Sequence, residues 1–269
     1  MKFLSVHNHE TVMDGGYLQL LLAAPFVLGL IIYLLILTKR KDQQTWPLFR
    51  TVSWIGGCIL AIGSVAGPVA ELAHHDFRMH MVSHLLLGML APLLLVLAAP
   101  MTLVLSTWKV EHARTLSRLL RSRYSQFVTH PVVATALNIG GLAILYRTNL
   151  YSLMHEHMIL YVVVHAHVFL AGYFFTVSMI YVDPTPHRES YLFRAIVLIC
   201  ALAGHGILSK HIYAYPPAGI PVPQAEQGAM LMYYGGDAID ALIIFFLCLQ
   251  WFKATRPKST CKEKKYSFV

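Results

Sequence analysis

The sequence predicts an all-α membrane protein, a polytopic bundle of about seven transmembrane helices. Of its 269 residues, 57% are hydrophobic and only 13% are charged, whereas charged residues make up about a quarter of a typical globular chain. A helix needs roughly 20 apolar residues to cross the hydrocarbon core, and backbone groups in lipid must be satisfied internally, which favours helices. The seven apolar windows are Tyr17–Thr38, Val52–Leu72, His80–Leu105, Val132–Tyr146, Met158–Tyr181, Phe193–Ala214 and Ala229–Phe252.

The basic residues are unevenly distributed between the two ends of these windows. With the amino terminus outside, only four of the 21 Lys and Arg residues fall in outer segments: Lys2, Arg78, Arg147 and Lys210. The positive-inside rule therefore predicts an outer amino terminus and a cytoplasmic carboxyl terminus. The net charge of +8 is explained by topology, and no nucleic-acid partner is expected.

Three segments follow from this topology. We expect an outer amino-terminal segment at residues 1–16, a seven-helix domain at 17–252 and a basic cytoplasmic tail at 253–269. The first apolar run is long enough to span a membrane and lacks a small-residue cleavage pattern, so it does not read as a cleavable signal. The outer segment contains His7 and His9, which either capture a metal ion or belong to a solvated terminus.

The turn between the second and third windows is rich in histidines and carboxylates. Glu71, His74 and His75 lie there, and a solvated turn explains them about as well as metal ligation does.

The third window begins with His80 and His84, four residues apart and therefore on one helical face. Met81 lies beside the first of them. Imidazole and thioether groups are preferred by soft or borderline metal ions, copper among them. Because His84 falls inside the apolar span, where ionisable groups are costly and usually functional or paired, we expect a metal handled near the membrane surface.

The fifth window carries further histidines. His157, Tyr161 and His165 recur every four residues and share a face. The helical rise places His165 about 12 Å below the start of the helix. His167 points elsewhere and also fits a bond to a neighbouring helix.

The last two windows add His205, Asp237 and Asp240. Counted inward from the outer helix ends, His84, His165, His205 and Asp237 all lie roughly 9–15 Å deep. Helical bundles build metal and cofactor sites from facing side chains of this kind. The spacing of Asp237 and Asp240 places both on one helical face, where they need cations, histidines or water as partners.

Several stretches resemble the Gram-positive type of the CtaG family, membrane proteins required for assembly of cytochrome c oxidase. They are RMHMVSHLLLGMLAPLLLVLAAP in the third window, VHAHVFLAGYFF at Val164–Phe175, VDP and PHR around Asp183–Arg188, and GGD at Gly235–Asp237. The likeness extends from about Leu18 to Phe252.

This resemblance implies a seven-helix bundle in a bacterial plasma membrane that matures a haem–copper oxidase by copper delivery or insertion. Its recurring histidines map onto His80, His84, His165 and His167, and its late acidic position maps onto Asp237. The implied partners are cytochrome c oxidase subunits, a copper ion and the lipid bilayer.

The leading hypothesis is a non-enzymatic metallochaperone. His80 and His84 capture copper at the outer face, assisted by His74, His75, His155 or Met81. Asp237 and Asp240 are expected to contact the histidines and fix their tautomers and orientation, as carboxylates commonly do. Further candidates for ligating or auxiliary roles are His165, His167, His205, His157 and Glu71.

Two other functions stay open. A haem-binding redox protein would use His84 or His165 facing His205 as axial ligands. A metal- or proton-coupled transporter would use the same level of His and Asp side chains as its pathway. The small-residue pairs Gly56–Gly57 and Gly140–Gly141 are compatible with a homo-oligomer.

Overall fold

The predicted all-α membrane class is confirmed. The computed structural model describes residues 4–40 and 46–257, with side chains from residue 16 onward, and every regular element in that part is helical. Six helices, counted over the described residues, are long and apolar enough to cross a membrane. The window expected to be a seventh is α9 (Pro131–Arg147), which is apolar but only 17 residues long, so the count of seven stays a prediction.

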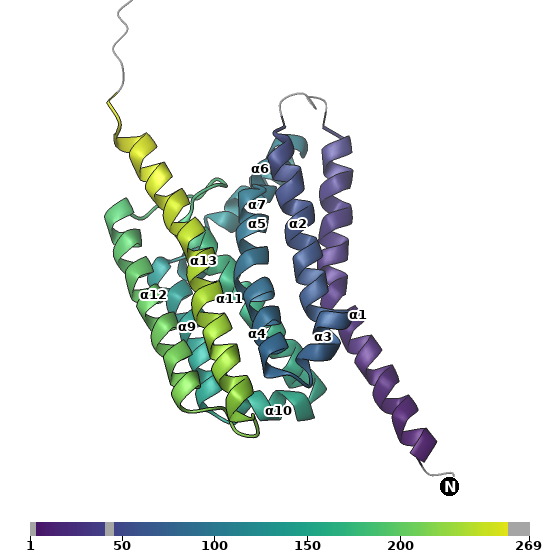
Figure 1. Cartoon of the computed structure of the whole chain (residues 1–269). Coiled ribbons are helices and arrows are strands. Elements are labelled where there is room, and N and C mark those ends of the chain that lie inside the picture. The colour runs from purple at the N-terminus through teal and green to yellow at the C-terminus, as the bar shows by residue number, and fades with distance from the viewer. Residues whose placement is uncertain (1–3, 41–45, 258–269) are drawn as a thin grey trace, which may run out of the picture.

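The helices form one bundle with α1 (Leu4–Thr38) and α2 (Leu48–Val65) at one side (Figure 1). The other side is formed by α12 (Tyr191–Ala214) and α13 (Val222–Thr255). Between them lie α9 and α11 (Met158–Met179) together with the third predicted span. The two ends of the described chain, at α1 and α13, lie at opposite ends of the bundle.

The second predicted helix is interrupted. Val52–Leu72 was expected as one helix, but α2 ends at Val65 and α3 (Pro68–Ala73) begins after a sharp turn. Gly67 adopts a φ of 80° there, a conformation that glycine tolerates without steric cost. Pro68 follows at the first position of α3, where its missing N–H has no helical partner to lose.

The third predicted helix is divided into four pieces. They are α4 (Phe77–Leu85), the π-helical segment η2 (Leu86–Leu90), α5 (Ala91–Leu97) and α6 (Pro100–Thr107). Pro92 lies in the first turn of α5, and a proline inside a helix removes a hydrogen bond and crowds the preceding turn. The wider π-turn before Pro92 accommodates both effects. Ala99, with a φ of 52°, then ends α5 ahead of Pro100.

The π-helical segment also permits an unusually close contact with α11. A side-chain carbon added to Gly172 would collide with the backbone carbonyl of Gly88, and one added to Gly88 would press on Val168. Two glycines facing each other let helix backbones approach closely, as small residues do in membrane bundles. This contact sets the spacing between α4–η2 and α11.

The remaining elements connect the spans. They are α7 (Val110–Leu120), α8 (Arg123–Val128) and α10 (Leu150–Glu156). Neither α7 nor α8 contains a buried residue, which is typical of a segment that lies along a membrane surface. The separate helix α10 was not predicted. It ends because His157 adopts extended backbone angles before α11.

The small-residue pairs proposed for self-association partly serve packing inside the chain. A side-chain carbon on Gly57 would meet Leu95, and one on Gly141 would meet the ring of His167. The homo-oligomer therefore stays a prediction, and its support is weaker because two of these glycines already contact residues of the same chain.

Candidate metal site

Three of the predicted histidines converge on one small cavity. His80 and His84 of α4 and His165 of α11 line a space of about 20 Å³, which Tyr146 of α9 closes on another side. The three rings are buried, with exposed fractions of 6–8%. A cavity this size holds about one water molecule, and hence has room for a single ion.

His80 is anchored by a tyrosine that sequence reasoning missed. Its Nε2 lies 3.0 Å from the hydroxyl oxygen of Tyr146, within hydrogen-bond distance. The ring also packs edge-on against Tyr151 of α10, with 4.9 Å between ring centroids. The only sequence signal for Tyr146 was a hydroxyl-bearing aromatic at the outer end of the fourth apolar window.

The backbone fixes the tautomer of His165. Its Nδ1 lies 2.9 Å from the carbonyl oxygen of Tyr161. Since a carbonyl only accepts, Nδ1 carries the proton and donates it, which leaves the Nε2 lone pair of the neutral ring available. Metal-binding histidines typically have their other ring nitrogen held in this manner.

His84 is the least satisfied of the three. Both of its ring nitrogens are buried without a hydrogen-bond partner among the described residues, and so is Nε2 of His205 on α12. The two rings lie 6.4 Å apart between centroids, at an interplanar angle of 26°. An unpaired buried polar group costs about 1–3 kcal/mol, so this pair suits a ligand-binding role better than a purely structural one.

A second small cavity continues inward from His205. It measures about 10 Å³ and is lined in part by His205, Asn138 and Asp240. Asp240 is buried with an exposed fraction of 4%, whereas Asp237 lies on the exposed side of α13. The two aspartates were expected to share an environment. Their environments differ, because Asp240 lies on the packed face of α13 and Asp237 lies beside that face, on the exposed side.

A series of aromatic rings connects the cavity to the end of the bundle that holds α3 and α10. His74 and His155 meet at 5.6 Å between centroids, and His155 lies 6.5 Å from His80. His74 stacks on Tyr161, and the tilted rings of Tyr161 and His165 lie 4.0 Å apart between centroids. His74 and His155 keep solvent exposure, so the series runs from the surface to the cavity.

His74 and His155 both have a lowered pKa, which favours their neutral form. Partial burial, followed by repulsion from His74 and His75, lowers the pKa of His155 to about 4. Burial and the charge of His75 also lower the pKa of His74. A neutral imidazole has a free lone pair, so these rings are available to a metal ion at neutral pH.

Other predicted ligands lie outside the cavity. The Nε2 of His167 is 3.1 Å from the carbonyl oxygen of Leu137 on α9, which matches the alternative of a bond to a neighbouring helix. Met81 is fully buried in the apolar core beside Phe77 and Met232. Three more candidates lie at exposed positions of the outer turns: Glu71, His75 and His157. The side chains of His7 and His9 lie outside the described residues.

Within the described part of the chain, no three His, Cys, Asp or Glu side chains stand together as a ready metal site. The histidines of the small cavity surround a shared space, but they must rotate to direct their nitrogens at one ion. The described residues therefore form no closed metal site of the structural kind.

Comparisons with known proteins identify a family that the chain matches. Residues 31–254 match the family described as cytochrome c oxidase caa3 assembly factor (Caa3_CtaG). An uncharacterized protein of Mycobacterium leprae (strain TN) is 30% identical over 218 residues, which are 76% of this chain and 31% of that protein.

Uncharacterized proteins of Mycobacterium bovis and Mycobacterium tuberculosis are each 30% identical over 179 residues, 62% of this chain and 26% of theirs. The chain thus spans about a third or less of the length of these curated relatives. No solved structure matches it.

Proposed function

Because the chain belongs to the family of cytochrome c oxidase caa3 assembly factors, we propose that it binds copper within the outer half of a bacterial plasma membrane and helps deliver it to a haem–copper oxidase. The observation that carries the proposal is the convergence of His80, His84 and His165 on one cavity of about 20 Å³. Copper is the cargo, and the role requires no catalysis of a reaction.

The chemistry of the donors supports copper. Imidazole nitrogens bind copper well, and affinity for such a site rises along the divalent series towards copper. His165 presents Nε2 because its Nδ1–H is held by the Tyr161 carbonyl, and His84 has two unpartnered nitrogens. His80 becomes the third ligand if its Nε2 gives up the hydrogen bond to the Tyr146 hydroxyl and binds the ion.

Delivery demands both an entry and an exit for the ion. The exposed pair His74 and His155 provides the first contact, and the 6.5 Å ring separation between His155 and His80 supports a short transfer inward. The His80–Tyr146 hydrogen bond, which copper would displace, offers a competing state that favours release. Oxidase subunits are the proposed recipients.

The unpaired nitrogens make His84 the residue to test. We expect detergent-purified wild-type protein, loaded with copper and washed, to retain about one ion. His84→Ala and His165→Ala are expected to weaken copper binding at least as much as the about 10- to 100-fold loss typical of residues that only orient ligands. His112→Ala on the exposed face of α7 is the matched control and is expected to bind copper normally.

His167→Ala discriminates between the family mapping and the cavity geometry. The cavity geometry predicts retained copper, because this ring faces α9. Oxidase activity of cells carrying each variant, with membrane insertion checked by immunoblot, gives the second readout. Unchanged copper retention and normal oxidase activity in the His84 and His165 variants would overturn the proposed site.

The haem alternative has less support. The two cavities beside His84 and His205 measure about 20 and 10 Å³, far less than a porphyrin needs. The large cavity on the other side of His165 is lined by neither His84 nor His205, so it offers no second axial histidine of the expected pair. A visible spectrum of the same purified protein tests this directly, because a stoichiometric Soret band would favour the redox function over copper delivery.

A further inference from the structure

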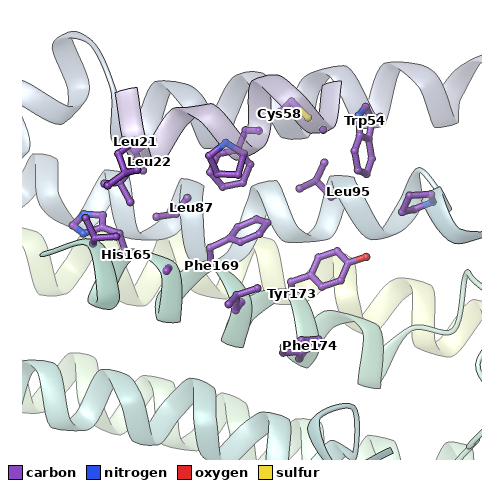
Figure 2. A pocket seen from close by; sticks show the side chains of 18 of the residues that line it. Leu21, Leu22, Trp54, Cys58, Leu87, Leu95, His165, Phe169, Tyr173 and Phe174 are labelled. Carbon is purple, nitrogen blue, oxygen red and sulfur yellow. The ribbon is translucent and has the colours of Figure 1, made fainter. Parts of the chain in front are cut away.

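A second, much larger cavity lies on the other side of His165. It measures about 630 Å³ and opens between α1 and α2 on one side and α5 and α11 on the other. Figure 2 shows Leu21, Leu22 and Trp54 facing Phe169 and Tyr173 across it, with His165 at one end. It is separate from the histidine cavity, with which it shares only Leu87 and His165.

The lining is that of a hydrocarbon-binding pocket. None of the described residues that line it is Asp, Glu, Lys or Arg. The polar groups of the lining are few. The Nδ1 of His165 donates to a backbone carbonyl, and the others include the Tyr173 hydroxyl and the Trp54 indole nitrogen, which is buried without a hydrogen-bond partner among the described residues. Two rim residues, Leu21 and Leu170, are 55% and 47% exposed, so the pocket is open on the side where a bilayer would lie.

The dimensions of the pocket restrict its occupant. Along α11 its lining runs from Val162 to Phe174, which is about 18 Å at the helical rise. A transmembrane helix needs roughly 20 residues, or about 30 Å, to cross the hydrocarbon core. The pocket is therefore too short to hold a membrane-spanning helix of a second copy.

We propose that one acyl chain of a bilayer phospholipid occupies this pocket. The helices that line the pocket, among them α1, α2, α5 and α11, run along the length of the bundle (Figure 1). The pocket is therefore aligned with the acyl chains of a surrounding bilayer. Its length is close to the about 15 Å depth of one leaflet, half of a typical hydrocarbon core. Its volume of about 630 Å³ has room for one long acyl chain.

An occupied pocket also has a structural consequence. Protein interiors are close-packed, and atoms that line a void lose their dispersion contacts. The acyl chain supplies those contacts between α1–α2 and α11. It also covers the face of His165 opposite the histidine cavity, and thereby becomes part of the apolar shell that limits solvent access there.

The experiment uses full-length protein in vesicles that contain phosphatidylglycerol with a photoactivatable diazirine on one acyl chain. After illumination, peptide mapping by mass spectrometry locates the crosslinks. We expect labels concentrated on the lining residues of α2 and α11, at several times the density found on the exposed faces of α12 and α13.

Two variants fill the pocket from opposite walls: Gly29→Leu on α1 and Ala166→Trp on α11. Either is expected to reduce crosslinking of the lining at least about threefold, so one suffices if the other does not fold. Ala203→Trp, on the exposed side of α12, is the matched control and leaves that labelling unchanged. Labels spread evenly around the bundle, or unaffected by both filling variants, would overturn the proposal.

The identity of the chain is tested separately. Lipids extracted from the purified protein are expected to contain phospholipid in a fixed ratio that falls in the filled variants. Recovery of a prenyl lipid in its place would overturn the assignment to an acyl chain. None of these measurements involves copper, so their outcome is independent of the proposed copper site.

Discussion

His84 and His165 show how differently two histidines that line one cavity are held. The backbone holds His165 in one tautomer, whereas His84 keeps both ring nitrogens buried and unpaired among the described residues. The first arrangement orients a nitrogen lone pair, and the second leaves a polar ring without a partner. Both arrangements support the proposed copper site, whose ion must be bound and then released.

Tyr146 is the residue that we expect to tune the site without binding the ion. Tyr146→Phe removes only the hydroxyl 3.0 Å from His80 Nε2. Stability is expected to fall by about 1 kcal/mol, the net value of a typical hydrogen bond. Copper affinity is expected to rise by about fivefold, the equivalent of the same 1 kcal/mol, because the hydroxyl no longer competes with the ion for His80 Nε2. Thermal unfolding in detergent and a copper competition titration measure the two effects.

Tyr151→Phe is the control for this change. Tyr151 touches the same His80 ring from α10 at 4.9 Å between centroids, but no hydrogen bond joins the two side chains. If the Tyr151 and Tyr146 variants alter copper affinity equally, aromatic packing rather than the hydroxyl controls His80, and the assigned role of Tyr146 is wrong.

The broken third span is the element that arranges the cavity. Because η2 widens the helix before Pro92, the carbonyl of Gly88 approaches Gly172 of α11 closely. His84 lies one turn before Gly88 on one side of this contact, and His165 lies two turns before Gly172 on the other. The spacing across the cavity therefore depends on two glycines that bear no functional group.

Gly172→Ala tests this dependence. The added methyl group collides with the Gly88 backbone, which cannot move as a flexible side chain does, so α11 must shift outward. We expect destabilisation of about 1–3 kcal/mol, the usual cost of overpacking, together with weaker copper binding. Thermal unfolding and copper retention are measured on the same preparation.

Gly63→Ala on α2 makes the same chemical change where a side-chain carbon meets nothing within 4 Å. It is expected to be neutral or slightly stabilising, because alanine favours helix over glycine. Equal effects of the two substitutions would show that the loss of glycine, and not the close contact, is responsible.

The limits of sequence reasoning are visible at these elements. Run length placed six of the seven predicted windows on helices that are long and apolar enough to cross a membrane, counted over the described residues. Helical spacing correctly put His80 and His84 on one face, since both line the same cavity. Run length alone did not reveal that Pro92 and Ala99 divide the third helix, since proline is tolerated in membrane helices. The partner of His80 and the contact between Gly88 and Gly172 were also unpredictable, because both depend on how distant helices pack.

At the level of the whole molecule, the charge pattern predicts which end of the bundle faces the cytoplasm. The histidine cavity lies toward the end formed by α4 and α10, opposite the basic helix α7 (Figure 1). If the positive-inside rule holds, copper enters from outside the cell. A reversed orientation would place the same histidines at the cytoplasmic face, so the direction of delivery depends on the topology.

Impermeant thiol labelling of intact cells determines this orientation. Tyr215→Cys lies in the connection between α12 and α13, and Leu119→Cys lies on α7; the native side chains are 69% and 62% exposed. Both are introduced in a Cys261→Ser background, since Cys261 belongs to the expected cytoplasmic tail. We expect the cysteine at 215 to react in intact cells and the one at 119 to react only after permeabilisation. The opposite pattern would invert the bundle and move copper capture to the cytoplasmic side, while equal labelling of both positions in intact cells would contradict a transmembrane arrangement altogether.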